Sequence, residues 1–208
     1  MKLKNLRPED YANKNLRDAL SISGISKEDI HDRRVKLRKY FDVLYSLYPV
    51  YENPDCLVKA KDLIHKLGVI RDMDVICYQP NRDKLAEIVS KKIRVMNNCF
   101  LPKVYGSRLL VFNRILSLQK KIEKIEDFHE LRKIVRTTRN LVESLGYRNK
   151  ELSSLAKEMG DLRDEILKME CEGKKVSIDV ENYKKRANEI IVKFIIYQDE
   201  FHHFSLQQ

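Results

Sequence analysis

The sequence contains few helix-breaking residues, with six glycines and five prolines among 208 residues. It also lacks any sustained alternation of apolar and polar residues, which is the pattern of a half-buried β-strand. Both features favour helices throughout the chain. No run approaches the ~18 apolar residues of a membrane-spanning helix, and the opening MKLKNLRPED has no apolar signal-peptide core. We therefore expect an all-α protein that is soluble and cytoplasmic, with no membrane partner.

Cysteine pairs with the spacing of a metal or redox motif are also missing. The four cysteines, Cys56, Cys77, Cys99 and Cys171, are widely separated and form no CxxC pair. This excludes a zinc ribbon and argues against a disulfide framework. Free cysteine behaves as a small apolar residue. We therefore expect buried free thiols in a reducing compartment.

Motifs of catalysis are missing as well. The sequence has no GxxxxGK[ST] phosphate loop, because the stretch after Gly173 lacks both the spacing and the hydroxyl residue. No nucleophile–histidine pairing stands out, and acidic clusters for two-metal phosphate hydrolysis are missing. Adjacent His202 and His203 would diverge by about 100° on a helix. Arginines would repel a divalent metal between His31 and His129. We expect no enzyme, cofactor or metal.

What the sequence does have is an excess of positive charge. Lysine and arginine number 41 against 31 acidic residues, which gives a net charge of +10 and a pI near 9.3. Such a surplus suits a polyanionic partner, whether nucleic acid, an anionic membrane or another phosphate polymer. With 43% hydrophobic residues, the chain can also bury a sizeable core. Charge alone does not choose among these partners.

Caps and breakers divide the chain into helical segments. Ser26 is an expected N-cap, with Asp29 three residues later. Gly68 and Gly160 are expected to end helices, as is Gly146. After Gly68, a helical stretch continues up to residue 80. The expected helices are 3–20, 26–48, 55–67, 83–100, 105–125, 127–146, 151–159, 162–171 and 180–204.

Two short patterns occur twice, in the same order. His, Arg and Arg stand at relative positions 0, 3 and 7 in two places 98 residues apart, and Gly-x-x-Arg-Asp follows each copy, 92 residues apart. This order predicts a tandem duplication of a helical unit, with a first repeat at 1–115 and a second at 116–208. The repeated residues are His31, Arg34, Arg38, Gly68, Arg71 and Asp72, then His129, Arg132, Arg136, Gly160, Arg163 and Asp164.

Each copy of the His-Arg-Arg pattern predicts a cationic ridge on one helix. At about 100° per residue, its three members lie within about 60° of one another, and Arg139 extends the second ridge by a turn. Arg34 with Arg38, and Arg132 with Arg136, are like charges four residues apart, which repel. Because no acidic residues are interspersed on these faces, we expect an anion to compensate them.

Phosphate is the anion that these residue types suit best. The planar arginine fork donates two parallel hydrogen bonds and never loses its charge. A protonated histidine beside phosphates would add two donors, and its pKa would rise. Two other interpretations stay open. The ridges are solvated faces, or His31 and His129 cap or pack near the helix starts. The pairs Arg71-Asp72 and Arg163-Asp164 are expected to form salt bridges at helix ends.

These residues resemble the CHAD family, the conserved-histidine α-helical domains. The family pattern of His, Arg, a basic pair and often another Arg is matched at positions 31–39 and 129–139, with Glu143 and Gly146 following. LGVIRDMDV at 67–75 is close to the family's LG-x-x-RD-x-DV signature. Phe41 and Thr137 depart from the pattern, because each stands where a basic residue is common.

The resemblance implies one stand-alone CHAD-like domain, 1–208, with two pseudo-symmetric four-helix bundles. It further implies that the basic ridges line a shared groove that binds inorganic polyphosphate, and a place at polyphosphate granules. The alternative is a nucleic-acid-binding helical protein, although only Tyr40 and Phe41 adjoin a ridge as stacking aromatics. A third is a structural helical adaptor. The implied site residues are His31, Arg34, Arg38, Lys39, His129, Arg132, Lys133, Arg136 and Arg139.

Overall fold

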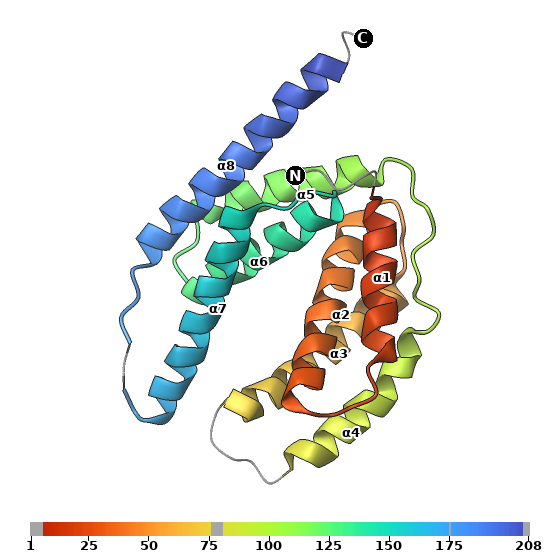
Figure 1. Ribbon diagram of the computed structural model, residues 1–208, viewed down its shortest axis with the longest axis vertical. Coiled ribbons are helices and arrows are strands. Elements are labelled where there is room, and N and C mark those ends of the chain that lie inside the picture. The colour runs from red at the N-terminus through yellow and green to blue at the C-terminus, as the bar shows by residue number, and fades with distance from the viewer. Residues whose placement is uncertain (1–5, 76–80, 175, 206–208) are drawn as a thin grey trace.

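Helices form the regular structure of the protein, as predicted. The computed structural model describes residues 6–75, 81–174 and 176–205, and these ranges contain no β-strand. The all-α fold class is therefore confirmed (Figure 1). The elements are α1 (Pro8–Ser21), α2 (Lys27–Leu47), α3 (Pro54–Val75), α4 (Arg82–Lys92), η1, a 3-10 turn (Ile93–Met96), α5 (Ser107–Ile122), α6 (Phe128–Ser144), α7 (Lys150–Cys171) and α8 (Val180–Ser205).

Side-chain caps fix where the central helices begin. Ser26 Oγ accepts a hydrogen bond from the Asp29 amide at 3.1 Å, and the Asp29 carboxylate accepts one from the Ser26 amide at 3.1 Å. The predicted capping box is therefore present. Asp127 caps α6 by accepting from the Glu130 amide at 2.8 Å. Because both caps precede a His-Arg-Arg motif directly, they set the rotation at which each motif enters its helix.

Two expected helix ends were wrong. Helix α3 runs unbroken through Gly68, and α7 runs through Gly160, so 151–159 and 162–171 form a single helix. Glycines with positive φ do occur at Gly146 and Gly173, where the chain leaves α6 and α7 as expected. The expected helix 83–100 is shorter than predicted, because α4 tightens into η1 at Ile93.

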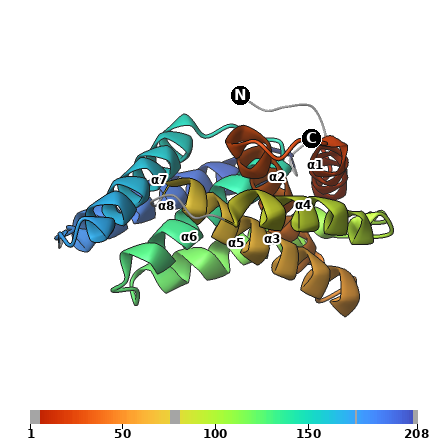
Figure 2. The same cartoon turned by 90° about the horizontal axis from the view of Figure 1, so that it is seen from below.

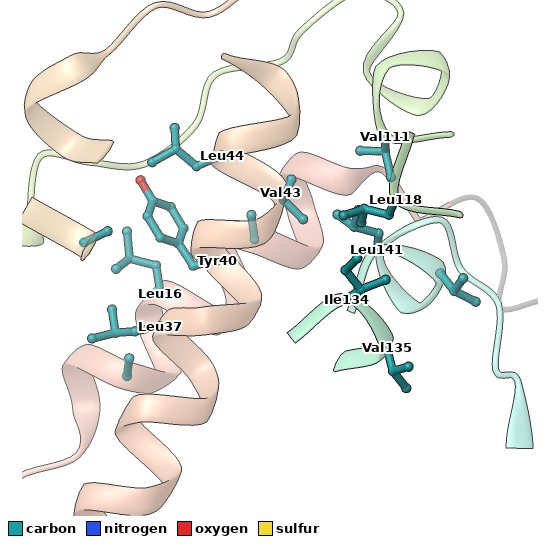
Figure 3. Close-up of a cluster of buried hydrophobic side chains, with 14 of the residues drawn as sticks. Leu16, Leu37, Tyr40, Val43, Leu44, Val111, Leu118, Ile134, Val135 and Leu141 are labelled. Carbon is teal, nitrogen blue, oxygen red and sulfur yellow. The ribbon is translucent and has the colours of Figure 1, made fainter. Parts of the chain in front are cut away.

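Helices α2 and α6 meet in the middle of the molecule. In Figures 1 and 2, α1 and α4 lie on one side, α7 and α8 on the other, and α2, α3, α5 and α6 between them. Helix α2 contacts α1, α3, α5 and α6, whereas α6 contacts α5, α7 and α8. One cluster of buried side chains draws on both halves of the chain, so α2 and α6 are held against each other by shared packing (Figure 3). The division into two bundles stays a prediction.

The cluster in Figure 3 explains why the centre is rigid. Leu37, Tyr40 and Leu44 of α2 are fully buried, and Val135 and Leu141 of α6 are fully buried in the same cluster. Burial of one large apolar side chain stabilises a fold by roughly 1.5–3 kcal/mol. The faces of α2 and α6 that carry the basic ridges are therefore held at fixed positions by the apolar faces behind them.

The expectation of free, buried cysteines was wrong. Cys56 and Cys99 form a disulfide that ties the start of α3 to the segment after η1, with their Cα atoms 5.6 Å apart. Sequence spacing could not show that these segments, 43 residues apart, adjoin. Cys171 is exposed, and Cys77 lies outside the described residues. The expectation of a reducing compartment therefore loses the observation on which it rested.

The described helices are all too short or too polar to cross a lipid bilayer.

Candidate functional site

The two basic ridges come together where α2 and α6 pack. Arg34 and Arg38 face Arg132 and Arg136 closely enough that the second pair lowers the pKa of both arginines of the first. We call these four residues the arginine cluster. Since the members lie 94 or more residues apart along the chain in cross-helix pairs, the cluster exists only because the two helices share a core.

The arginine cluster is uncompensated. None of its four side chains forms an ion pair or a hydrogen bond with another described residue, and the Nε atom of each is buried without a partner. Burial, followed by repulsion from neighbouring arginines, lowers the pKa of Arg34 and of Arg132 to about 10 and that of Arg38 well below its ordinary value. Unpaired buried charge is costly, so the ligand-free cluster stores unfavourable electrostatic energy.

Arg33 shows how this protein treats an arginine with a structural role. Its side chain is also buried, yet its terminal nitrogens donate to Ser90 Oγ at 2.6 Å and to the carbonyl of Gly24 at 3.2 Å. Those bonds hold the loop between α1 and α2. The members of the arginine cluster have no such bonds, so their charge has no comparable structural use.

One buried carboxylate adjoins the cluster. Asp42 accepts from Asn140 Nδ2 at 2.7 Å and from Thr137 Oγ1 at 3.2 Å. Burial raises the pKa of Asp42, while Arg136 and Arg38 act to lower it. Thr137, which departs from the family pattern, therefore has a defined role here, because it donates a hydrogen bond to an acid that lies beside Arg38 and Arg136.

The repeated glycines explain how the arginines reach across the neighbouring helices. A Cβ atom added at Gly68 would lie 3.2 Å from Nη2 of Arg34, and one at Gly160 would lie 3.9 Å from Nη2 of Arg132. Gly68 thus leaves room for the guanidinium of Arg34 to cross α3, whereas a Cβ at Gly160 would be at ordinary contact distance from Arg132. Both glycines lie inside a helix, beside an arginine of the preceding motif helix.

One of the two Arg-Asp motifs joins distant segments of the chain. Arg71 of α3 pairs with Asp164 of α7, and it also contacts Asp72 at 3.3 Å near the end of α3. Arg163 pairs with Glu170 at 3.6 Å within α7. The predicted salt bridge of Arg71 with Asp72 is therefore present, whereas that of Arg163 with Asp164 was wrong, because Asp164 pairs with Arg71.

Arg71 and Arg163 also extend the cationic site, which the sequence reasoning missed. Arg71 lowers the pKa of Arg34 and of Arg132, and Arg163 lowers that of Arg132. The signal was present in the sequence, because each stands three residues after a glycine that faces a ridge, and so lies on the same helix face.

The two histidines lie at the open end of the site. His31 and His129 are exposed, but neighbouring groups displace part of their water and lower the pKa of both rings, helped by Arg38 and by Lys133 respectively. Both are therefore neutral at pH 7 in this ligand-free structure. The predicted rise in pKa needs a bound anion and stays a prediction.

Three predicted site residues already have acidic or amide partners. Lys39 donates to Glu143 at 2.7 Å, and Arg139 donates to Asn140 at 3.0 Å with its Nε 3.8 Å from Glu143. Lys133 donates to Glu130 at 2.6 Å. The structure thus separates these three cations from the uncompensated arginines of the cluster.

A pocket of about 530 Å³ opens beside the cluster between α2, α3, α5 and α6. Arg38 and Arg136 line it, as do Phe41 and Thr137, the two departures from the family pattern. Sequence reasoning missed the further cations of its rim because they come from α3, from α5 and from the segment after α5, none of which carries the His-Arg-Arg motif. These cations are Lys61, Arg114, Lys121 and Lys124.

Among residues 6–75, 81–174 and 176–205, no three acidic, histidine or cysteine side chains gather closely enough to hold a metal ion. The side chains of His202 and His203 lie outside the described part.

Comparison with known proteins gives one structural likeness. No family model matches the sequence, and no curated protein is significantly similar to it. The structure is similar to the crystal structure of the CHAD domain from the plant Ricinus communis, with a TM-score of 0.52 and 15% identity over 93% of this chain and 88% of that one. The protein therefore has a CHAD-like fold, as the resemblance of its paired motifs implied.

Proposed function

We propose that this protein binds inorganic polyphosphate in a basic groove lined by the arginine cluster. The observation that carries the proposal is the meeting of four guanidinium groups that repel one another and whose buried Nε atoms have no hydrogen-bond partner. Hydrogen bonds to charged groups contribute roughly 1.5–3 kcal/mol each. An anion that supplies several oxygens in a row would therefore relieve the repulsion and satisfy donors at the same time.

Polyphosphate fits this arrangement through its repeat. It carries about one charge per unit and presents no bases, so its affinity comes from phosphate contacts and counterion release. His31 and His129 would become protonated beside the bound phosphates. Arg71 and Arg163, which lie beyond the cluster, would join only by exchanging their acidic partners, and the same holds for Lys39, Lys133 and Arg139. We therefore expect these five cations to contribute less than the arginine cluster.

We further propose a binder, without a catalytic step. Asp42 adjoins the cluster, but it is buried and accepts hydrogen bonds from Asn140 and Thr137, which leaves it badly placed to activate water. A protein with this binding activity would be found wherever the polymer accumulates, including cytoplasmic granules.

The alternative partner, nucleic acid, is favoured by one feature. Phe41 and Tyr45 stack beside Arg38, with ring centroids 6.0 Å apart and planes at 29°. Tyr40, the other aromatic next to the ridge, is fully buried and donates to the carbonyl of Cys99, so it cannot stack on a base.

Titration separates the candidates. Long-chain polyphosphate and single-stranded RNA of matched charge would be titrated into the protein and into a variant with Arg34, Arg38, Arg132 and Arg136 changed to Gln. We expect tighter binding of polyphosphate than of RNA, and a loss of at least a hundredfold in the variant.

A matched control removes the same charge elsewhere. Lys84, Lys91, Lys157 and Lys185 are exposed and lie outside the cluster, so their change to Gln should alter polyphosphate affinity only slightly. An equal loss of polyphosphate affinity in this control would show that binding depends on the net charge of the protein and not on the arginine cluster. Equal affinity for RNA and polyphosphate would instead favour the nucleic-acid alternative.

A further inference from the structure

The pocket beside the arginine cluster has a surface that a chain of phosphates cannot use. Its wall is formed by the apolar side chains of Ile64, Leu118, Ile125 and Ile134, together with the rings of Phe41 and Tyr45. A ligand that consists of charge alone would leave this apolar surface in water. Its volume of about 530 Å³ lies within the range of small-molecule and cofactor sites.

The aromatic residues of the pocket suit a flat ring. Tyr45 leaves 44% of its surface exposed although it is flanked by core residues. The guanidinium of Arg114 lies 4.9 Å from its ring centroid, and the Phe41 ring is stacked beside it with centroids 6.0 Å apart. Aromatic rings and guanidinium planes are the groups on which proteins stack nucleobases. This corner is therefore suited to a planar aromatic group.

Cations surround the apolar wall and continue into the arginine cluster. Lys61, Lys121 and Lys124 lie on the rim, and Arg38 and Arg136 connect the pocket to the cluster. Of the two acids that line the pocket, Glu130 is paired with Lys133 and Asp42 is buried. The apolar wall is thus short and bounded by positive charge, which suits a compact ring attached to phosphates better than a long acyl chain.

Only the first repeat supplies the aromatic residues of the pocket. The 98-residue offset aligns Phe41 with Arg139 and Tyr45 with Glu143. In the second repeat, Glu143 accepts hydrogen bonds from Tyr11 at 2.7 Å and from Lys39 at 2.7 Å. A closed polar network therefore occupies the place that the open aromatic pocket has in the first. A polymer that needed only the two ridges would gain nothing from this difference.

We propose that the pocket takes the base of a nucleoside polyphosphate, with the base against Phe41 and Tyr45 and its phosphates reaching Arg38 and Arg136. This goes beyond polyphosphate binding, because it assigns the protein a ligand that carries an aromatic group. The two ligands would share Arg38 and Arg136, so each would compete with the other.

Calorimetric titrations with ATP and with inorganic triphosphate test the proposal, each on the parent protein and on Tyr45→Ala. Tyr45 is exposed, so the variant should fold normally, which its melting temperature would verify. We expect ATP to bind at least tenfold more tightly than triphosphate. We also expect Tyr45→Ala to weaken ATP about tenfold, the loss typical of one base stack, without changing the affinity for triphosphate.

Failure of this proposal can be told apart from failure of polyphosphate binding. Equal binding of ATP and triphosphate by the parent protein, or an unaffected Tyr45→Ala, would overturn the pocket while the arginine cluster could still bind polyphosphate. Tighter binding of decyl phosphate than of ATP to the parent protein would also overturn the proposal, because the pocket would then prefer an alkyl chain to a base. Arg132→Gln lies outside the pocket, so it should weaken polyphosphate much more than ATP.

Discussion

Removal of one charge from the arginine cluster should make the ligand-free protein more stable. The pKa of Arg34 and that of Arg132 fall from the ordinary value of an arginine to about 10. Because one pH unit corresponds to about 1.4 kcal/mol, each charge costs the folded state on the order of 3 kcal/mol. A basic group whose pKa is lower in the folded state destabilises it at every pH below that pKa, so the full cost applies at pH 7.

Arg34→Met and Arg132→Met keep much of the apolar stem and remove this charge. Relaxation around the site will return only part of the cost, so we expect a gain of about 1–2 kcal/mol in the free energy of unfolding. For a chain of this size, that corresponds to a rise of roughly 2–8 °C in melting temperature. Thermal unfolding at low ionic strength, without phosphate in the buffer, measures it directly.

Two matched variants sharpen the test. Arg34→Lys retains the charge and should give no gain. Arg186 pairs with Glu158 at 2.6 Å, so Arg186→Met removes a compensated charge and should not stabilise the protein. Added polyphosphate should raise the melting temperature of the parent more than that of either methionine variant. A lower melting temperature for both Arg34→Met and Arg132→Met would refute the claim that these charges are uncompensated.

Three further predictions concern the same elements. Gly160→Ala should stabilise the protein by about 0.5–1 kcal/mol, because its Cβ would lie 3.9 Å from Arg132. Gly68→Ala should gain less, since its Cβ would lie 3.2 Å from Arg34, and chemical denaturation compares the free energies of unfolding of the two variants. Polyphosphate affinity should rise as pH falls from 7 to 5, because a bound anion raises the lowered pKa of His31 and of His129 and so takes up protons; calorimetry on His31→Gln with His129→Gln should show a flat profile. Reduction of Cys56–Cys99, 43 residues apart, should cost about 4 kcal/mol by loop entropy, and a melt of Cys56→Ser with Cys99→Ser should not respond to reductant.

The sequence predicted the features that depend on neighbours along the chain. Helical periodicity, the capping box at Ser26 and the caps and glycines that bound α6 were all readable, because each involves residues within one or two turns. Cationic ridges are local in the same sense. Their like charges at four-residue spacing already indicated an arrangement that needs an anion.

Features that depend on contacts between distant segments could not be predicted from the sequence. Glycine is the residue type that commonly follows the end of a helix, but Gly68 and Gly160 both lie inside a helix, with an arginine from the preceding motif helix beside each of them. The pairing of Arg71 with Asp164 needs α3 and α7 to meet, and the disulfide needs α3 to meet the segment after η1. No spacing in a single sequence encodes such meetings.

The pocket was missed for a similar reason. In the sequence, Phe41 was noted as a departure from the family pattern and as an aromatic beside a ridge, and Tyr45 was not singled out. Their significance appears once Arg114 of α5 lies over Tyr45 and the rim lysines from other helices surround both rings.

The central claim is that the arginine cluster contacts a chain of phosphates, and the salt dependence of binding tests it most directly. Affinity for long-chain polyphosphate would be measured across a salt series for the parent protein and for the variant with Arg34, Arg38, Arg132 and Arg136 changed to Gln. With a coefficient of about 0.7 per contact for a flexible strand, the logarithmic slope should become shallower by about 3 in the variant. Unchanged slope and affinity would contradict the account, because the four arginines would then contact no phosphate.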